Sequence, residues 1–294
     1  MAPTQLPYTV YDAFTSKAFA GNPAAIIILQ PDHGLSDAQL QLIGREFNLS
    51  ETAFLVPLAD HRADAPHFSI RWFTPQIEAP LCGHATLAAA CHLRAAHPEL
   101  QGPYRFESRV SGVLAVAYDA ATDLYELDFP ADVPVPAADA ASAFSMAQTW
   151  FPQLAPADIK AVSTTGRGYL VEVAETVDVS SVINSSIAIA RDILVGQCVI
   201  TAPHAPTAAD PSQVHSRMFA CGSGIDEDPV TGSAHTRIVP YWLSKWGGNV
   251  LKCRQVSARG GDLDTVWRRE DGRVLLRGHG VKMAEGVLFL GNGQ

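Results

Sequence analysis

Two short strings in this chain are nearly the same and lie about half a chain apart. EAPLCGHA at residues 78–85 matches EDPVTGSA at residues 227–234 in its Glu, Pro, Gly and Ala, an offset of 149 residues in a chain of 294. The same offset places GVL at residues 112–114 opposite GDL at residues 261–263. Matches that keep one register across two blocks indicate an internal duplication. The sequence therefore predicts two similar halves.

Each copy places a proline and a glycine directly before a segment with helical character. Residues 84–97 are rich in alanine and nearly uncharged, which predicts a buried helix. A second helix is expected from Ser233, with Pro240 kinking or splitting it.

Free backbone N–H groups at a helix start attract anions, so the starts at Gly83 and Gly232 are candidates for holding a carboxylate. The alternative is that both turns only initiate helices. The polar and thiol side chains beside them favour a site: Cys82, His84, Asp228, Thr231 and Ser233.

Other segments are typical of strands and of one surface helix. Ser36 and Gln39 have the spacing of a capping box, apolar residues then recur at helical intervals, and Asn48 is a plausible stop. Alternating or short apolar segments predict strands in both halves. The fold class is therefore α+β. A Pro/Ala-rich stretch at residues 131–156 suggests the boundary between an N-terminal lobe, 1–130, which residues 282–294 could complete, and a C-terminal lobe, 131–281.

Composition and charge narrow the function. Twenty-one basic against thirty acidic residues give a net charge of −9, so no cationic field is available for nucleic acid or for an anionic membrane surface. No apolar run is long enough to span a membrane. Five cysteines without a CxxC pair, and no leader-like N-terminus, predict a cytoplasmic protein. No HExxH or GxGxxG motif is present, so neither a metal nor another cofactor is expected.

The motifs resemble the phenazine biosynthesis PhzF-like isomerases, relatives of diaminopimelate epimerase. The landmarks run through most of the chain in family order: VYDAFTSKAFAGNPAAII, NLSETAFL, IRWFTPQIEAPLCGHATLAAA, LDFPA, FACGSGIDEDPVTGSAHTRIVPYW and QVSARGGDL. The resemblance implies two pseudo-symmetric domains, each a curved sheet or barrel around a central helix, with the active site between them. It also implies a homodimer and a cofactor-independent isomerase.

The same resemblance assigns the site. It implies that Glu51 is the acid/base, with His84 and Asp228 completing the catalytic group. Substrate-binding positions would be Gly83, Gly232, Ser233, Thr231 and Cys82. The expected reaction moves a proton between carbons of a small carboxylate-bearing metabolite, whose identity the sequence leaves open.

Two alternatives remain at this point. Racemases related to this family use two thiols, one at each helix start, but here the position equivalent to Cys82 is Thr231, whose hydroxyl cannot act as a thiolate base. An amino-acid racemase or epimerase would have to use Cys82 as its only thiol base. The second alternative is a catalytically silent binding protein of the same fold.

Overall fold

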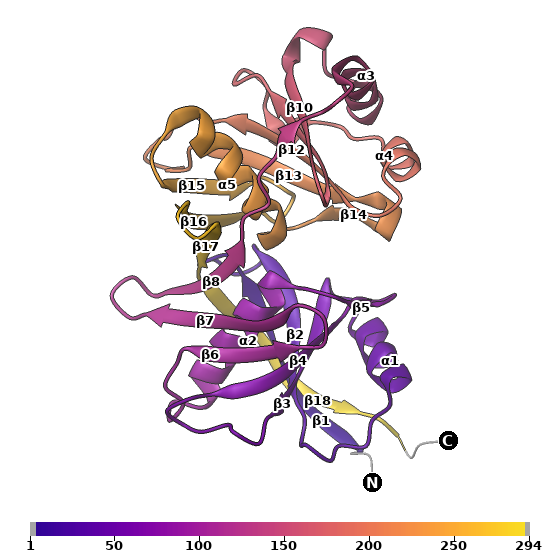
Figure 1. Ribbon diagram of the computed structural model, residues 1–294. Coiled ribbons are helices and arrows are strands. Elements are labelled where there is room, and N and C mark those ends of the chain that lie inside the picture. The colour runs from indigo at the N-terminus through magenta and orange to yellow at the C-terminus, as the bar shows by residue number, and fades with distance from the viewer. Residues whose placement is uncertain (1–3, 292–294) are drawn as a thin grey trace. The chain divides into compact units, whose positions relative to one another are not determined.

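The computed structural model describes residues 4–291 of the chain, which form two compact units (Figure 1). Unit 1 comprises the described residues up to Asp128 together with those from Arg277 onward, and unit 2 is Phe129–Leu276. The boundary falls inside two strands, β8 (Leu124–Pro130) and β17 (Arg273–Gly278). Each unit contains a mixed sheet and helices, which is the α+β class expected from the sequence.

Unit 1 is built from β-strands that pair mainly with their neighbours in sequence. Strand β1 pairs antiparallel with β2 and β18, β2 pairs parallel with β3, and β4 pairs antiparallel with β3 and β5 and parallel with β6. Strand β7 joins β6 to β8. The bounds are β1 Gln5–Ala13, β2 Asn22–Ile28, β3 Glu51–Pro57, β4 His67–Phe73, β5 Glu78–Ala79, β6 Tyr104–Ser108, β7 Gly112–Asp119 and β18 Gly280–Phe289.

Unit 2 repeats this pattern strand for strand. Strand β10 pairs antiparallel with β11 and β9, β11 parallel with β12, and β13 antiparallel with β12 and β14 and parallel with β15, which pairs antiparallel with β16. The bounds are β9 Val135–Pro136, β10 Ile159–Thr165, β11 Gly168–Val173, β12 Gln197–Pro203, β13 Val214–Ala220, β14 Ile225–Asp228, β15 Val250–Gln255 and β16 Gly261–Arg268. The duplication inferred from two strings therefore extends through the sheet of each unit.

The first half of the sequence contributes one strand, β9, to unit 2, and the second half contributes one strand, β18, to unit 1. Strand β9 follows β8 in the chain but pairs with β10 of unit 2, and β18 follows β17 but pairs with β1 of unit 1. The C-terminal strand is thus part of the sheet that begins at the N-terminus.

Five α-helices accompany the strands in the described part of the chain: α1 Asp37–Phe47, α2 Gly83–Ala96, α3 Ala140–Trp150, α4 Ser186–Asp192 and α5 Gly232–Trp246. The start of α1 has the predicted capping box between Ser36 and Gln39, and Asn48 ends the helix in the left-handed conformation. Helix α3 was missed, although Asp139 caps it by accepting a hydrogen bond from Ser142 N at 3.0 Å.

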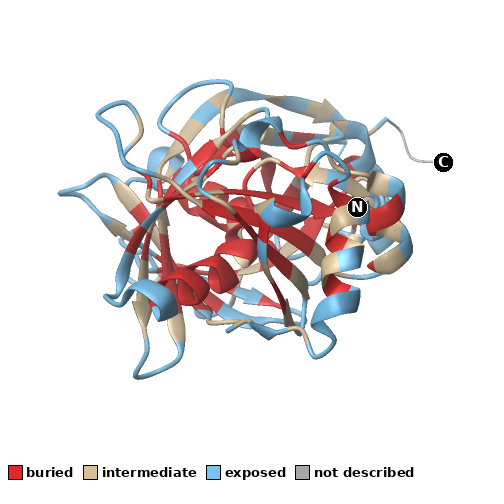
Figure 2. Ribbon diagram, turned by 90° about the horizontal axis from the view of Figure 1, so that it is seen from above, coloured by how far each residue is buried: buried red, intermediate tan, exposed pale blue. Residues whose placement is uncertain are grey.

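Helices α2 and α5 are the buried helices of the two units. Most residues of each are enclosed, and buried residues lie on strands and helices while the connecting loops are mainly exposed (Figure 2). Helix α5 continues through Pro240 as one element and is not split. Proline lacks the N–H that would bond to the carbonyl of Thr236, but the backbone N–H of Asp132 donates to that oxygen instead, at 3.0 Å.

Among the described residues, none of the helices combines the length and the apolar character required to cross a bilayer.

Candidate active site

Three side chains of unit 1 meet where β3 and α2 begin. Glu51 is the first residue of β3, Cys82 is the N-cap of α2, and His84 is the second residue of that helix. Glu51 Oε2 lies 3.0 Å from His84 Nε2, and Cys82 Sγ lies 3.4 Å from His84 Nδ1. The structure therefore brings the carboxylate of Glu51, from a separate part of the sequence, to the neighbouring thiol and imidazole at the start of α2.

Strand register explains why a fourth residue joins them. Strands β2 and β3 are parallel, with Ala24 opposite Glu51, so the starts of both strands lie at one edge of the sheet. Asn22 begins β2 at that edge, is fully enclosed, and places its Nδ2 at 3.1 Å from His84 Nδ1. Asn22 thereby fixes the orientation of the imidazole ring, and its role was missed from the sequence.

Burial and neighbouring groups act on the two titratable side chains at the start of α2. Burial disfavours a charge on His84, but the adjacent Cys82 and Glu51 outweigh it, so the pKa of His84 lies well above its ordinary value. Burial, and then the charge of Glu51, raise the pKa of the Cys82 thiol to about 11. At neutral pH the cysteine therefore remains a thiol.

The corresponding place in unit 2 holds neutral groups. Thr231 is the N-cap of α5, Ser233 is the second residue of the helix, and Gln197 is the first residue of β12. Gln197 Nε2 donates to Ser233 Oγ at 2.9 Å. The same three elements thus carry an amide and two hydroxyls in place of the carboxylate, thiol and imidazole of unit 1.

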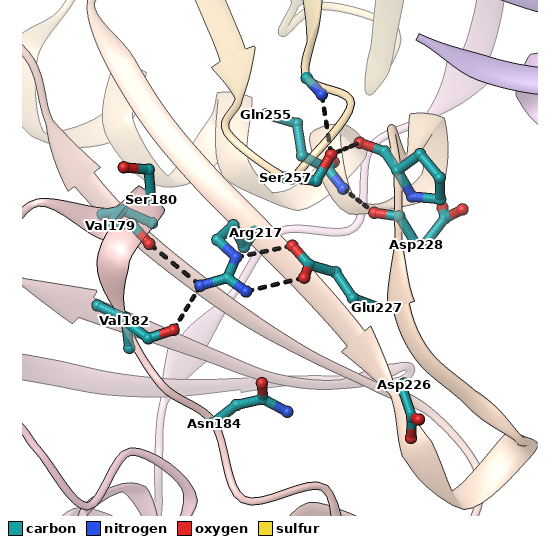
Figure 3. Close-up of polar contacts among 12 residues, drawn as sticks. Val179, Ser180, Val182, Asn184, Arg217, Asp226, Glu227, Asp228, Gln255 and Ser257 are labelled. Atoms are coloured by element: carbon teal, nitrogen blue, oxygen red, sulfur yellow. Dashed lines mark hydrogen bonds and ion pairs between the residues drawn. The ribbon is translucent and has the colours of Figure 1, made fainter. Parts of the chain in front are cut away.

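Asp228, at the end of β14, contributes a carboxylate to the start of α5. Its Oδ2 accepts a hydrogen bond of 2.5 Å from the Thr231 hydroxyl. The enclosed Gln255 Nε2 donates to the carbonyl of Asp228 at 2.5 Å, and its Oε1 accepts from Thr231 N at 2.9 Å. The amide of Gln255 therefore fixes the turn between β14 and α5, as Figure 3 shows for its bond to Asp228.

An arginine and a glutamate tie together the strands that precede each helix. In unit 1, Arg71 Nε and Nη2 donate to Glu78 Oε1 and Oε2, both at 2.7 Å. In unit 2, Arg217 makes the same two-bond contact with Glu227, at 2.7 and 2.8 Å (Figure 3). Paired N–H···O bonds of this kind fix geometry as well as adding stability. Both glutamates belong to the repeated strings, so the repeat encodes this contact.

The predicted site residues therefore fall into three contacting groups. Gly83 and Gly232 are the first residues of α2 and α5, as expected. Among the remaining predicted residues, Glu51 and Cys82 both contact His84, and Asp228 contacts Thr231. Ser233 contacts Gln197, which was not predicted. Sequence reasoning missed Asn22, Gln197 and Gln255, although Asn22 and Gln255 stand in landmark strings.

Two groups of described side chains have donor sets that could hold a cation. One ligand atom from each of Glu51, Cys82 and His84 lies within 4.8 Å of the others, and the same holds for His204, Asp210 and His215. Neither group forms a metal-binding motif in the sequence: Glu51 is remote from Cys82 and His84, and His204 and Asp210 lie in the loop between β12 and β13, before His215 of β13.

The comparisons with known proteins identify the family. The family model described as phenazine biosynthesis-like protein matches residues 11–286. An uncharacterized isomerase of Pseudomonas aeruginosa is 39% identical over 287 residues, covering 97% of this chain and 99% of the relative. The human phenazine biosynthesis-like domain-containing protein is 35% identical over 293 residues, covering 97% and 99%.

Solved structures agree in fold. A PhzF-family phenazine biosynthesis protein from Enterococcus faecalis has a TM-score of 0.81 at 32% identity, covering 97% of this chain and all of that chain. A hydroxyproline epimerase from Agrobacterium vitis has a TM-score of 0.59 at 12% identity, which shows a shared fold alone; it covers 98% of this chain and 94% of that one. The chain belongs to the phenazine biosynthesis-like (PhzF) family and is an isomerase.

Proposed function

We propose that Glu51 is the single acid/base of this isomerase and moves a proton between two carbons of a small carboxylate-bearing metabolite. The observation that carries the proposal is the contact between Glu51 Oε2 and His84 Nε2, 3.0 Å long, at the start of α2. The Glu51 side chain is only 12% exposed. A carboxylate held in a largely enclosed polar site is suited to proton transfer.

The chemistry requires stabilisation of negative charge. When Glu51 takes a proton from a substrate carbon that lies next to a C=C bond conjugated with the carboxylate, the electron pair delocalises over that double bond and into the carboxylate, and the double bond moves by one position when the far carbon is protonated. The backbone N–H groups at Gly83 and the imidazole of His84, 3.0 Å from Glu51, are suited to bind the resulting charge. Return of the proton from Glu51 to a second carbon completes the isomerisation and restores the carboxylate.

The remaining polar residues are proposed to bind and orient the substrate. Thr231 and Ser233 supply hydroxyls at the start of α5, and Asp228 supplies a negative charge suited to an amino group. Cys82 lies against His84 and is proposed to shape the site without titrating.

A racemase that uses Cys82 as its base is the competing mechanism. The pKa of Cys82, raised to about 11 by burial and by the charge of Glu51, leaves little thiolate at neutral pH. The equivalent residue in unit 2, Thr231, has no thiol at all. Both observations favour the carboxylate.

The test is proton exchange in deuterium oxide. The protein is incubated with a panel of amino acids and cyclic or unsaturated carboxylates, and proton NMR detects loss of C–H signal and formation of an isomer. Glu51→Gln is expected to abolish both turnover and deuterium incorporation while the circular dichroism spectrum is unchanged. Exchange at the wild-type rate in Glu51→Gln would refute the proposal.

A second variant separates the two mechanisms. Under the single-carboxylate mechanism Cys82→Ala lowers the rate only moderately, because the side chain supplies packing and no proton. Under the racemase mechanism the same change removes the base and abolishes exchange. Comparing the exchange rates of Glu51→Gln and Cys82→Ala on one substrate therefore shows which side chain is the base.

A further inference from the structure

We propose that Asn22 is a positioning residue that decides which nitrogen of His84 carries the proton, so that the imidazole donates to Glu51 and cannot act as a second base. The consequence for the base rests on the proposed function, whereas the position of the proton does not. The proposal starts from an asymmetry around the ring. Hydrogen-bond donors face Nδ1, and a carboxylate faces Nε2.

Two donors lie against Nδ1 of His84. Asn22 Nδ2 is 3.1 Å away, and an amide nitrogen donates but does not accept. Cys82 Sγ is 3.4 Å away. Because burial and then the charge of Glu51 raise the pKa of Cys82 to about 11, the sulfur keeps its proton and is a weak donor as well. A proton on Nδ1 would point at both groups, so Nδ1 is held as an acceptor.

The other side of the ring has the opposite requirement. Glu51 Oε2 lies 3.0 Å from Nε2, and an ionised carboxylate only accepts. The two side chains are only 12% and 5% exposed, so water does not separate them. An unprotonated Nε2 would therefore set two lone pairs against each other in an enclosed site. Nε2 carries a proton whether the ring is charged or neutral.

The backbone around Asn22 is tight enough to impose this arrangement. Asn22 begins β2, pairs with Ala13 of β1, and is fully enclosed. Gly21, directly before it, has a φ of +70°, and a Cβ there would lie 2.3 Å from the carbonyl oxygen of Ala13. Only glycine allows so close an approach of two backbone segments. The amide of Asn22 is thus presented to His84 from a fixed position.

The consequence is that His84 cannot relay a proton. A relay would require Nε2 to give its proton to Glu51 while Nδ1 receives another from a group behind it. The amide of Asn22 does not ionise, and the thiol of Cys82 gives up its proton poorly because its pKa is raised. Within this group Glu51 therefore remains the base, and the imidazole holds it in place.

His235 of α5 provides an internal reference with the opposite arrangement. Its Nδ1 lies 2.8 Å from the carbonyl oxygen of Thr231, which only accepts, so Nδ1 carries the proton. Burial lowers the pKa of His235 to about 4, so the ring is neutral at neutral pH and Nε2 is unprotonated. Two enclosed histidines of one chain are thus expected in opposite tautomers.

Nitrogen NMR of the intact, isotope-labelled protein measures both tautomers without any substrate. Protonated and unprotonated ring nitrogens differ strongly in chemical shift, and couplings to the carbon-bound ring protons distinguish Nδ1 from Nε2. His84→Gln and His235→Gln assign the signals. As the pH is raised, we expect His84 to lose its proton from Nδ1 and keep the one on Nε2. His235 should show an unprotonated Nε2 throughout the neutral range.

Two matched substitutions test whether Asn22 is responsible. Asn22→Asp keeps the shape but replaces the donor with an acceptor, so Nδ1 of His84 should keep its proton to a higher pH, between two carboxylates. The cationic ring then holds Glu51 in an ion pair, and turnover should fall about tenfold or more. Asn184→Asp makes the same change where Nδ2 donates to Ser186 Oγ, and should leave the titration of His84 unchanged.

The outcomes separate this inference from the proposed function. A wild-type His84 that loses the Nε2 proton, or keeps both protons to the alkaline limit of the folded state, overturns the inference whatever Glu51 does. An unchanged titration of His84 in folded Asn22→Asp overturns the role of Asn22. The expected tautomer together with wild-type turnover in Asn22→Asp overturns the consequence for the base. Full exchange activity in Glu51→Gln overturns the proposed function and leaves the tautomer standing.

Discussion

The starts of α2 and α5 occupy equivalent places in their units but carry different chemistry. Strand register makes Glu51 equivalent to Gln197, because Thr52 pairs with Phe73 as Cys198 pairs with Phe219. The first residue of β3 contacts the second residue of α2, and the first residue of β12 contacts the second residue of α5. The contact is carboxylate to imidazole in unit 1 and amide to hydroxyl in unit 2.

The backbone support is the same in both places, which shows what duplication preserved. Thr86 Oγ1 donates to the carbonyl of the N-cap Cys82 at 2.5 Å, and His235 Nδ1 bonds to the carbonyl of the N-cap Thr231 at 2.8 Å. Both helices therefore keep a side-chain bond back to their own first turn. The backbone frame is shared, whereas the carboxylate, the thiol and the imidazole at these equivalent positions belong to unit 1.

The largest expected difference between the two regions is in catalysis. Glu51→Gln should lower turnover by about 10²–10⁴-fold, the usual contribution of a general acid/base. The matched change Gln197→Ala removes only a hydrogen bond to Ser233 and should raise KM more than it lowers kcat. Steady-state kinetics of both variants check this, and equal losses of kcat would remove the distinction between the units.

A buried charge provides the next comparison. Arg237 of α5 is fully enclosed and none of its nitrogens has a hydrogen-bond partner among the described residues, whereas the residue at the same place in α2 is Ala88. Burial lowers the pKa of Arg237 to about 10, and Asp132 Oδ2, 3.6 Å away, opposes that shift.

Removing only the carboxylate of Asp132 should therefore destabilise the fold, because the buried charge of Arg237 would be left without its partner. Asp132→Asn is expected to lower the free energy of unfolding by about 3–5 kcal/mol, while Arg237→Met, which removes the charge itself, should be nearly neutral. Urea unfolding of both variants measures this. A larger loss in Arg237→Met would show that Arg237 itself supplies stability that the apolar α2 does not need.

The two arginine–glutamate contacts should differ in how much they contribute to the free energy of unfolding. Without Glu78, Arg71 still has the carboxylate of Asp37 at 2.7 Å, but without Glu227, Arg217 keeps its bonds to the neutral carbonyls of Val179 and Val182. Glu227→Gln should cost about 2–3 kcal/mol and Glu78→Gln about 1 kcal/mol less. Equal unfolding free energies for the two variants would mean that Asp37 does not compensate.

Histidines at the two helix starts should give stability an opposite dependence on pH. Burial lowers the pKa of His235 to about 4, so the unfolded chain binds more protons and stability falls as pH drops below about 6.5. The pKa of His84 is raised, so its contribution is present below the unfolded value and is lost as pH rises through the folded one.

The measurement is unfolding free energy at several pH values. Between pH 7 and pH 5 the contribution of His235 should decline by up to about 2 kcal/mol, and His235→Gln should remove that decline. His84→Gln should instead reduce the change in unfolding free energy on the alkaline side of the pH profile. A wild-type acid limb that survives in His235→Gln would assign the decline to other groups.

Local signals in the sequence were sufficient for several elements. The capping box at Ser36, the buried alanine-rich helix after Gly83 and the repeat that contains Glu78 and Glu227 all rest on interactions between near neighbours or on direct comparison of strings. Helix α3 was not predicted because the segment around it is rich in proline, a residue that is typical of loops, although Asp139 is a suitable N-cap. Pro240 does not split α5, because the freed carbonyl of Thr236 accepts from Asp132 N, which is remote in sequence.

The sequence by itself determined the duplication, the two helix starts and the family, since these are carried by residue types at fixed spacing. Only the tertiary structure decided which groups touch. Parallel pairing of β2 with β3 brings Asn22 and Glu51 to one edge, and only there do they meet His84. Strand register is set by packing over the whole sheet, so a contact between the start of a strand and the start of a remote helix cannot be read from spacing along the chain.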